Sequence, residues 1–328
     1  MNAKPIQLRG LFPAPSVPFD QDEKIIENEF SQHIAHMGTI NGIGGVAVNG
    51  HQGEMLALSR RERQRIIELA RASLPTDRLV ISGVLAPSVA ETVEQLREAR
   101  DAGADAALVL PPFDYMPRRI LARSTDAPVA YFSAVAEKID FPLVIFQYPH
   151  ATGVWYTTET MVKLAAIPSV VGTKHAVRHL ELYAEQWEAL RGKISVLAAR
   201  DAPGLLSKMM VGADGACIGI ANIAPQFWAD YVTLCLNQQF VEARTVFMQR
   251  LLPLINHVWS EAVPRRVTYS ASTKEALVQL GIFTSAHVRA PEIDVNAAER
   301  MEIRTGLIKA GLLERNASQA HNATGSRS

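Results

Sequence analysis

The chain has 328 residues, a formal net charge of zero at pH 7 and a hydrophobic fraction of 48%. This length and apolar content allow one large barrel or two domains with a sizeable core. No basic block is present, which argues against a nucleic-acid binder, since such a protein must neutralise phosphates. No apolar run is long enough to span a bilayer and no signal segment precedes residue 10, so we expect a cytoplasmic protein without a membrane partner.

The two cysteines, Cys217 and Cys235, show neither CxxC spacing nor a neighbouring histidine. This pattern predicts thiols in a reducing compartment and no metal site.

Short apolar runs alternate with helical patterns in chain order. A short strand is expected within residues 11–20, and further strands are expected at 44–48, 79–84, 106–110, 142–147, 169–174, 194–199 and 215–219. Helices are expected at 27–38, 59–72, 88–103, 128–138, 158–166, 177–190 and 203–211. Ser59 with Glu62, and Ser88 with Glu91, have the spacing of helix-capping boxes.

The strands are apolar on both faces, which is typical of parallel strands buried on two sides. Eight strand–helix units predict an α/β protein with a closed (β/α)₈ TIM barrel, here residues 1–224. From residue 225 to 315 the pattern is helical without strands, with helices expected at 227–236, 240–259, 272–280 and 296–313, and we interpret it as a C-terminal appendage. Residues 316–328 are small and polar and are expected to be disordered.

Lys174 ends the sixth expected strand, 169–174. In a barrel of parallel strands the C-terminal strand ends carry the chemistry. A lysine there can place its amine in a pocket, where desolvation favours the uncharged, nucleophilic form. The alternative is an ordinary lysine whose stem is buried and whose head reaches solvent.

Other strand ends carry polar groups that converge in a barrel. The turn from Gly50 to Glu54 follows the second strand, and its glycines would expose backbone amides to a small anion such as a carboxylate. Arg200 and Asp201 follow the seventh strand. None of these groups shows a metal-ligand spacing, so a metal-free mechanism is favoured.

Several segments together resemble the dihydrodipicolinate synthase / N-acetylneuraminate lyase family of class I aldolases over about residues 8 to 300. They are Val17-Pro18-Phe19-Asp20, Gly50-x-x-Gly53-Glu54, Ala102-Gly103-Ala104-Asp105, Pro111-Pro112, Pro149-x-x-x-Gly153, Val171-Gly172-Thr173-Lys174, Gly212-Ala213-Asp214-Gly215 and Ala221-Asn222. The resemblance implies a (β/α)₈ barrel, a pyruvate-type Schiff base on Lys174 without any other cofactor, and a homotetramer. It also implies that the substrate carboxylate rests on the amides of Gly50 to Gly53.

Five positions depart from what the resemblance implies. His51 and Gln52 stand where the family has two hydroxyl residues. Phe146 replaces the strand-five tyrosine that transfers protons, and Asp114 replaces the second tyrosine of that relay. Ala151 replaces the arginine that grips the aldehyde substrate of the synthases. Authentic dihydrodipicolinate synthase activity is therefore an alternative and not the leading hypothesis.

Another group must then move protons. His51 is the first candidate, because it adjoins the expected carboxylate site and histidine titrates near neutral pH; a loop spacer is the alternative. Tyr148 could supply the missing hydroxyl if its loop bends inward. Asp114 could bind a substrate hydroxyl, and Arg200 could hold a distal carboxylate or pair with Asp201.

The expected substrate-contacting set is Gly50, Gln52, Gly53, Phe146, Asp114, Arg200 and Cys217. The leading hypothesis is a Schiff-base lyase acting on a 2-oxo acid, pyruvate or a sugar-derived keto acid. One possible reaction is the formation or cleavage of an aldol bond. The other is dehydration of a 2-oxo-3-deoxy acid, which is considered because residues 252–257 resemble a segment of such dehydratases. A barrel that binds a 2-oxo acid without turnover is the remaining alternative.

Overall fold

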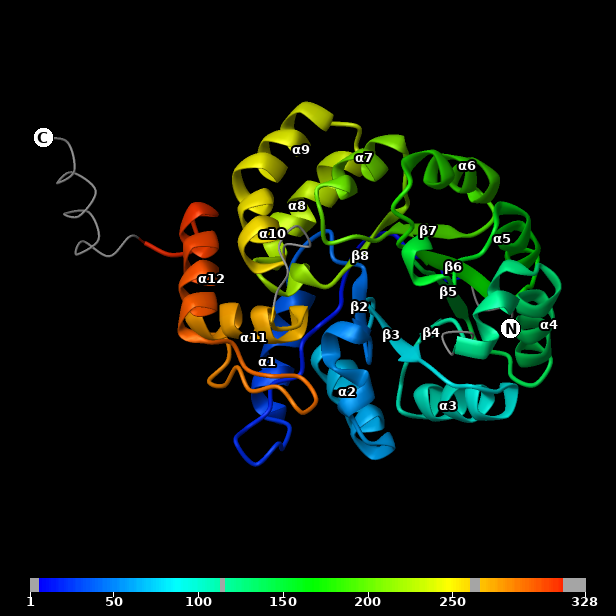
Figure 1. The fold of residues 1–328 in the computed structure, drawn as a ribbon, viewed down its shortest axis with the longest axis horizontal. Helices are drawn as coiled ribbons and strands as arrows, with labels where there is room; N and C mark the ends of the chain where they lie inside the picture. Colours follow the sequence, from blue (N-terminus) through cyan, green and yellow to red (C-terminus); the bar gives the residue numbers. More distant parts are fainter. Residues whose placement is uncertain (1–5, 113–115, 260–265, 315–328) are drawn as a thin grey trace, which may run out of the picture.

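The computed structural model describes residues 6–112, 116–259 and 266–314. Eight parallel strands form one sheet in the neighbour order β1-β8-β7-β6-β5-β4-β3-β2 (Figure 1). The strands are β1 (Gly10–Pro13), β2 (Gly45–Val48), β3 (Leu79–Val84), β4 (Ala106–Val109), β5 (Leu143–Gln147), β6 (Val170–His175), β7 (Ser195–Ala198) and β8 (Gly215–Ile218).

The ring closes between β1 and the residues that lead into β2. Leu11 and Ile43 form a parallel bridge, and the Leu11 amide donates to the Gly42 carbonyl at 2.8 Å. A side chain at Gly45 would lie 2.1 Å from the Leu79 carbonyl oxygen, so only glycine permits this approach of β2 to β3. The predicted (β/α)₈ barrel is confirmed.

Helices surround the ring (Figure 1). They are α1 (Glu27–Gly38), α2 (Arg60–Ser73), α3 (Val89–Asp101), α4 (Asp126–Ala136), α5 (Thr158–Ala165), α6 (Leu180–Leu190), α7 (Gly204–Val211) and α8 (Pro225–Leu236). The Ser59–Glu62 capping box is present with both of its bonds, whereas at α3 the Ser88 side chain accepts from the Glu91 amide.

Two expected helices differ from the structure. Helix α6 begins at Leu180 rather than at residue 177, because Ala176 and Arg178 instead form part of a cavity wall. The helix expected at 240–259 is interrupted: α9 (Phe240–Val246) and α10 (Leu252–Val258) flank a π-helical turn, Phe247–Leu251. Pro253 lacks an amide hydrogen, which explains why the regular hydrogen-bond ladder shifts just before it.

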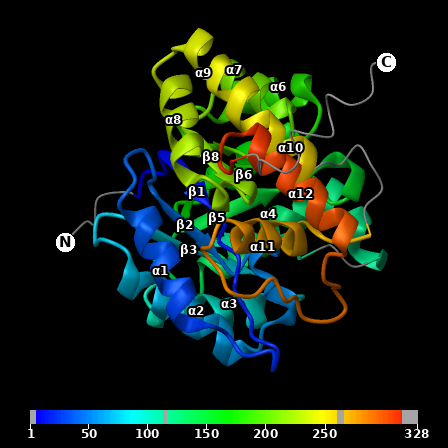
Figure 2. The ribbon, with the colours of Figure 1, turned by 90° about the vertical axis from the view of Figure 1, so that its left-hand side faces the viewer.

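The C-terminal helices α10, α11 (Tyr269–Gln279) and α12 (Ala297–Lys309) pack together against one side of the barrel (Figure 2). Helix α11 reaches the loop after β2, where Lys274 forms a fully buried ion pair with Glu54. The short helices η1 (His51–Gly53), η4 (His150–Thr152) and η5 (Ile220–Asn222) follow β2, β5 and β8, and such single turns carry no sequence periodicity. The expected tail at 316–328 lies outside the described residues.

Candidate active site

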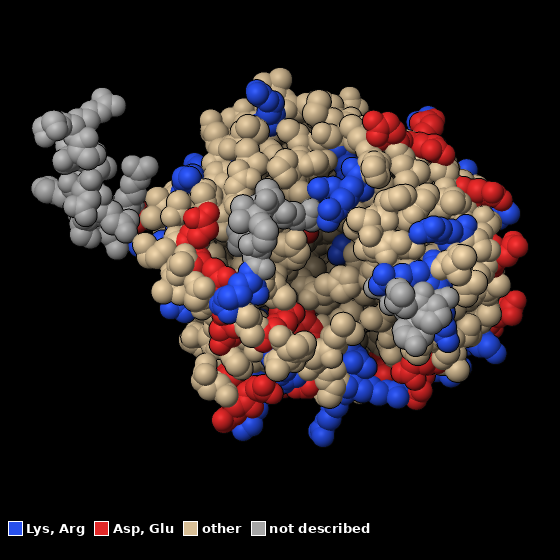
Figure 3. Space-filling view, in the orientation of Figure 1, with Lys and Arg blue, Asp and Glu red and all other residues tan. Residues whose placement is uncertain are grey.

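A cavity of about 450 Å³ opens at the C-terminal ends of the barrel strands. Figure 3 shows the hollow near the centre of this face, with basic side chains at its edge. Six of the residues predicted from the sequence line it: Lys174, His51, Gln52, Phe146, Tyr148 and Arg200. These side chains, predicted from the sequence, therefore lie together at the end of the barrel where the structure has this cavity.

Lys174 enters this cavity because β6 alternates its side chains. Lys174 faces the barrel interior, whereas His175 points back between the sheet and α6. The Lys174 Nζ atom lies 4.5 Å from the centroid of the Phe146 ring. Among the described residues, no carboxylate forms an ion pair with this amine.

Tyr148 bends inward and meets His51 at the cavity wall. Its hydroxyl lies 3.0 Å from His51 Nε2, and its ring packs edge-to-face on Phe146 with a centroid distance of 4.6 Å. His51 is exposed at the cavity mouth, and the protein around its ring still removes part of its hydration. This desolvation, and secondly the charge on Lys174, lower the pKa of His51 to about 4. The expectation of a histidine that titrates near neutral pH is wrong, because this imidazole stays neutral there.

The loop after β2 turns tightly between two residues in the left-handed region, Asn49 (φ 53°) and Glu54 (φ 52°). Such residues cost free energy unless their surroundings hold them. Asn49 Nδ2 donates to the Arg63 carbonyl at 2.9 Å. None of the hydrogen bonds among the described residues uses the backbone amides of His51 and Gln52, so both N–H groups are available at this turn.

Glu54 is held by the C-terminal region. Its carboxylate pairs with Lys274 and accepts the Arg289 amide at 3.1 Å. Burial raises the pKa of Glu54 and lowers that of Lys274, and the attraction between the two charges opposes both shifts. Arg289 further binds Glu62 through both carboxylate oxygens. This network fixes the turn that carries His51 and Gln52 to α11.

Gly50 and Gly53 are not part of the cavity lining; Gly53 donates its amide to the Gly50 carbonyl at 3.1 Å and shapes the turn from behind. Cys217 is buried in β8 and also does not line the cavity, and burial raises the pKa of its thiol. Its predicted contact with substrate is not seen in this geometry, because Cys217 packs in the core cluster below the mouth. Asp114 lies outside the described residues.

The sequence missed several lining residues, among them Arg178, Trp259, Thr268, Tyr269, Ser270 and Glu292. Trp259 and Tyr269 stack with ring centroids 4.4 Å apart and an interplanar angle of 7°. A side chain at Gly219 would lie 2.6 Å from Trp259 Cη2, so this glycine leaves room for the indole. No local pattern marks these residues: Arg178 lies between β6 and α6, and the others come from the region that follows the barrel.

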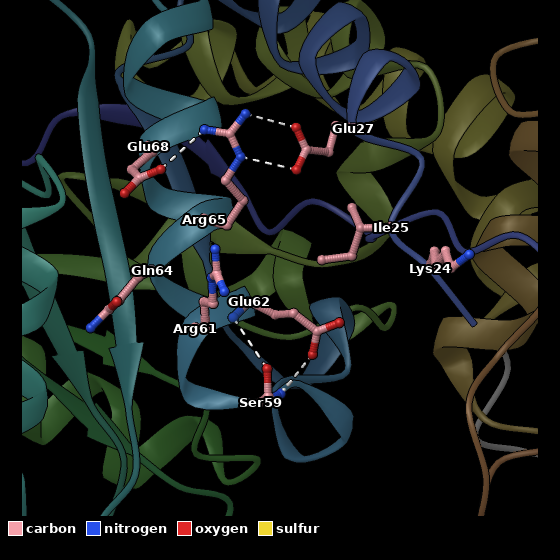
Figure 4. Close-up of a pocket in the computed structure, with 9 residues that line it drawn as sticks. All are labelled: Lys24, Ile25, Glu27, Ser59, Arg61, Glu62, Gln64, Arg65 and Glu68. Carbon is pink, nitrogen blue, oxygen red and sulfur yellow. Dashed lines mark hydrogen bonds and ion pairs between the residues drawn. The ribbon is translucent and has the colours of Figure 1, made fainter. Parts of the chain in front are cut away.

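A larger depression, about 780 Å³, lies outside the barrel between the beginnings of α1 and α2 (Figure 4). Arg65 crosses it and donates to both carboxylate oxygens of Glu27, at 2.9 and 2.7 Å, and to Glu68 at 3.0 Å. Because these charges neutralise one another and no strand end reaches this groove, we do not place chemistry there.

Among the described residues, no three His, Cys, Asp or Glu side chains are grouped to hold a metal ion. None of the described helices combines the length and the apolar character that a membrane span requires.

Comparisons with known proteins agree with this geometry. The sequence profile of the dihydrodipicolinate synthetase family matches residues 7–310. The 4-hydroxy-tetrahydrodipicolinate synthase of Phenylobacterium zucineum is 29% identical over 93% of this chain and 98% of its own length. That of Bartonella tribocorum is 30% identical over 94% of this chain and 99% of its own length.

Among solved structures, the pyruvate complex of dihydrodipicolinate synthase from Acinetobacter baumannii superposes with a TM-score of 0.81 at 26% identity, covering 93% of this chain and 99% of that one. The sialic acid aldolase of Ruminococcus gnavus shares the fold, with a TM-score of 0.79 at 20% identity over 92% of this chain and 97% of its own. The chain belongs to the dihydrodipicolinate synthetase family and is a Schiff-base lyase of the class I aldolase type.

Proposed function

We propose that Lys174 forms the Schiff base with a 2-oxo acid of the pyruvate type. The observation that carries this proposal is the position of its amine in the barrel-mouth cavity, against the face of Phe146 and without a carboxylate partner among the described residues. No carboxylate therefore competes with a substrate for this amine, and the cavity places it where it can add to the ketone of a bound 2-oxo acid.

The reaction begins when the Lys174 amine adds to C2 of the 2-oxo acid, and loss of water gives an iminium cation. In the aldolase direction the C3–C4 bond breaks, its electron pair enters the iminium to form an enamine, and the C4 hydroxyl proton passes to a base. In a dehydration, a C3 proton leaves first, and the enamine electrons then expel the C4 hydroxyl with a proton as water. After aldol cleavage, a proton returned to C3 of the enamine restores the iminium; after dehydration, loss of the hydroxyl has already restored it. Water then hydrolyses the iminium, which releases the 2-oxo acid product and returns the free amine.

The amides of His51 and Gln52 are suited to the substrate carboxylate, because they belong to the first turn of η1 and neither N–H group has an acceptor among the described residues. Gly50 and Gly53 let the loop make this turn. Gln52 is fixed from behind, since its Nε2 atom donates to Ser16 Oγ at 2.9 Å. The side chains at these positions then orient the anion without supplying hydroxyl groups.

Tyr148 and His51 are proposed as the proton-transfer pair in place of the tyrosine missing at Phe146. The neutral imidazole accepts from or donates to the phenol across 3.0 Å, so a proton moved by one group can be replaced by the other. A bound substrate carboxylate beside His51 would raise the pKa of its ring from about 4.

Arg178 and Arg200, on the β6 and β7 side of the cavity, are proposed to favour substrates with a distal anionic group. The position of the synthase arginine, Ala151, is exposed and does not line the cavity. A distal carboxylate would therefore bind at the ends of β6 and β7 rather than at the position of Ala151. Asp114, a replacement for a relay tyrosine, remains a candidate for a substrate hydroxyl.

Borohydride reduction with pyruvate tests the covalent step. We expect one adduct per chain, located on Lys174 by peptide mass spectrometry, and none in Lys174→Met. Lys163→Met is the matched control, because Lys163 is an exposed lysine paired with Glu159 on α5. Absence of an adduct in the wild type, under conditions that label a control aldolase, would refute the proposal.

A panel of 2-oxo-3-deoxy acids with neutral and carboxylate tails separates the reactions. Pyruvate release indicates retro-aldol cleavage, and loss of water without pyruvate indicates dehydration. Aspartate semialdehyde with pyruvate tests authentic synthase activity. Adduct formation without turnover of any substrate would favour a binding protein.

A homotetramer in the cytoplasm is proposed on family resemblance alone, and light scattering after size-exclusion chromatography tests the assembly.

A further inference from the structure

Behind the cavity, the strand ends are held by a buried polar layer between the sheet and helices α6 and α7. Gln147, His175, Gln186 and Lys208 form it, and each is at most 2% exposed. Gln147 separates Phe146 from Tyr148, and His175 directly follows Lys174. Because strand side chains alternate, Gln147 and His175 are the outward neighbours of residues that face the substrate cavity, whereas Gln186 and Lys208 reach the layer from α6 and α7.

Gln186 of α6 joins β5 to β6. Its Oε1 atom accepts from Gln147 Nε2 at 3.0 Å and lies 2.6 Å from His175 Nε2. Its Nε2 atom donates to the Tyr156 carbonyl at 3.0 Å. The Gln186 side chain therefore bridges the two strands at the level from which the side chains of Phe146 and Lys174 extend into the cavity.

Lys208 of α7 joins β6 to β7 in the same way. Its amine donates to the His175 carbonyl and to the Ala199 carbonyl, both at 2.9 Å. The His175 carbonyl also accepts the Ala199 amide at 3.0 Å, which is the last bond of the β6–β7 ladder. Lys208 thus extends the ladder by one step, at the point where the two strands diverge around the cavity.

A lysine in this place needs an explanation, since burying an ammonium group is costly. Within the described residues no carboxylate pairs with Lys208, and its other neighbour is the ring of Tyr183, whose centroid lies 4.9 Å from Nζ. Burial, followed by the charge on Arg200, lowers the pKa of Lys208 to about 7. An apolar residue would fill the site at lower cost but would lack the two donors, and an uncharged amine keeps both.

We propose that Lys208 is a positioning residue that holds β6 to β7 and thereby keeps the Lys174 amine against Phe146 in the cavity. Gln186 performs the same task on the β5 side. Lys208 does not line the cavity, so it acts through the strand rather than on the substrate. This inference rests on the proposed role of Lys174.

Lys208→Met tests it, because methionine keeps most of the volume and removes the donors. We expect the rate of adduct formation on Lys174 at saturating pyruvate to fall at least tenfold, while the half-saturating pyruvate concentration changes less than threefold. Lys193→Met, at an exposed lysine that also donates to a main-chain carbonyl, should match the wild type. The wild-type to Lys208→Met rate ratio should be the same at pH 6.5 and pH 9, because both donors survive deprotonation.

Three results would overturn the proposal. One is a Lys208→Met rate within twofold of the wild type, which would leave Lys208 a purely structural role even if melting falls. Another is a rate ratio that collapses to one at pH 9, which would assign the effect to charge instead of to the two bonds. The third is a crystal structure of Lys208→Met in which Nζ of Lys174 stays at its 4.5 Å distance from the Phe146 centroid.

The crystallographic arm does not depend on catalysis, so it separates failure of this inference from failure of the Schiff-base proposal, which the wild-type adduct tests. If Lys208→Met does not fold, Gln186→Met gives the same two readouts from the β5 side. A wild-type rate and an unmoved Lys174 in that variant would also overturn the proposal.

Discussion

The amine of Lys174 lies over the ring of Phe146, with Nζ 4.5 Å from the ring centroid. A cation near an aromatic face is stabilised by about 0.5–2 kcal/mol, depending on how far it is desolvated. Phe146 cannot transfer a proton, but its π face can favour the iminium over the neutral carbinolamine. Although Phe146 lacks the hydroxyl of a tyrosine, its ring can thus still stabilise the iminium intermediate.

Phe146→Leu should lower the yield of borohydride-trapped pyruvate adduct at limiting pyruvate by roughly 2- to 30-fold, which corresponds to that cation–π energy. Phe132→Leu, at a fully buried ring of α4 outside the cavity, controls for lost packing. Equal adduct yields in wild type and Phe146→Leu would show that the ring face contributes nothing to the intermediate.

Tyr148→Phe should lower turnover by about 10²-fold or more, because general acid–base groups contribute on that scale. Its adduct with pyruvate should still form, only more slowly. Tyr156→Phe removes a fully buried hydroxyl that has no partner among the described residues and should leave turnover unchanged. Turnover in Tyr148→Phe at the wild-type level would exclude the Tyr148–His51 pair from proton transfer.

His33 makes stability depend on pH below neutrality. Burial lowers its pKa from 6.5 to about 4. Between these two pH values the unfolded chain binds a proton on His33 that the folded chain does not bind. Stability from this group is complete above pH 6.5 and declines as the pH falls toward 4, by roughly 3 kcal/mol.

Urea unfolding of wild type and His33→Gln at pH 7 and pH 5 checks this sign. The variant should lose less stability across the interval, whereas His36→Gln, at an exposed position of the same helix, should follow the wild type. A variant slope equal to that of the wild type would contradict the assignment.

Lys274→Met should lower the free energy of unfolding by about 3 kcal/mol or more, because it leaves Glu54 buried without its cation. The double variant Glu54→Gln/Lys274→Met should be more stable than Lys274→Met alone. Lys163→Met breaks an exposed pair of α5 and should cost less than about 0.5 kcal/mol. Additive losses in the double variant would mean that the two side chains do not act as a pair.

Gly219→Ala should lower the free energy of unfolding by about 1–3 kcal/mol, because its Cβ would fall 2.6 Å from Trp259 Cη2. Trp259→Phe should restore part of this loss in the double variant, since it removes the contacted ring edge. Gly204→Ala is the control, as its Cβ would meet only ordinary contacts at 3.8 Å. Unfolding that is unchanged in Gly219→Ala would show that the indole moves aside freely.

Local sequence determined the barrel and its reactive end. Strands buried on both faces read as apolar runs, helices start at caps such as Ser59, and a lysine that ends a parallel strand falls at the open mouth, so these features depend on neighbouring residues alone. The late start of α6 needed the structure, because Ala176 and Arg178 form part of the cavity wall there. The π-helical turn before Pro253 has a local cause, the missing amide hydrogen of proline, but apolar periodicity alone does not register it.

Only the tertiary structure decided the outer wall and the charges of the site. Trp259 and Tyr269, far along the chain from Lys174, close the cavity because α11 docks on the β2 loop through Glu54 and Lys274. The neutral state of His51 arises from burial and the charge on Lys174, and the amine of Lys208 meets two carbonyls of different strands. Solvation and contacts between residues far apart in the chain set these properties. Neither can be inferred from the local order of residues.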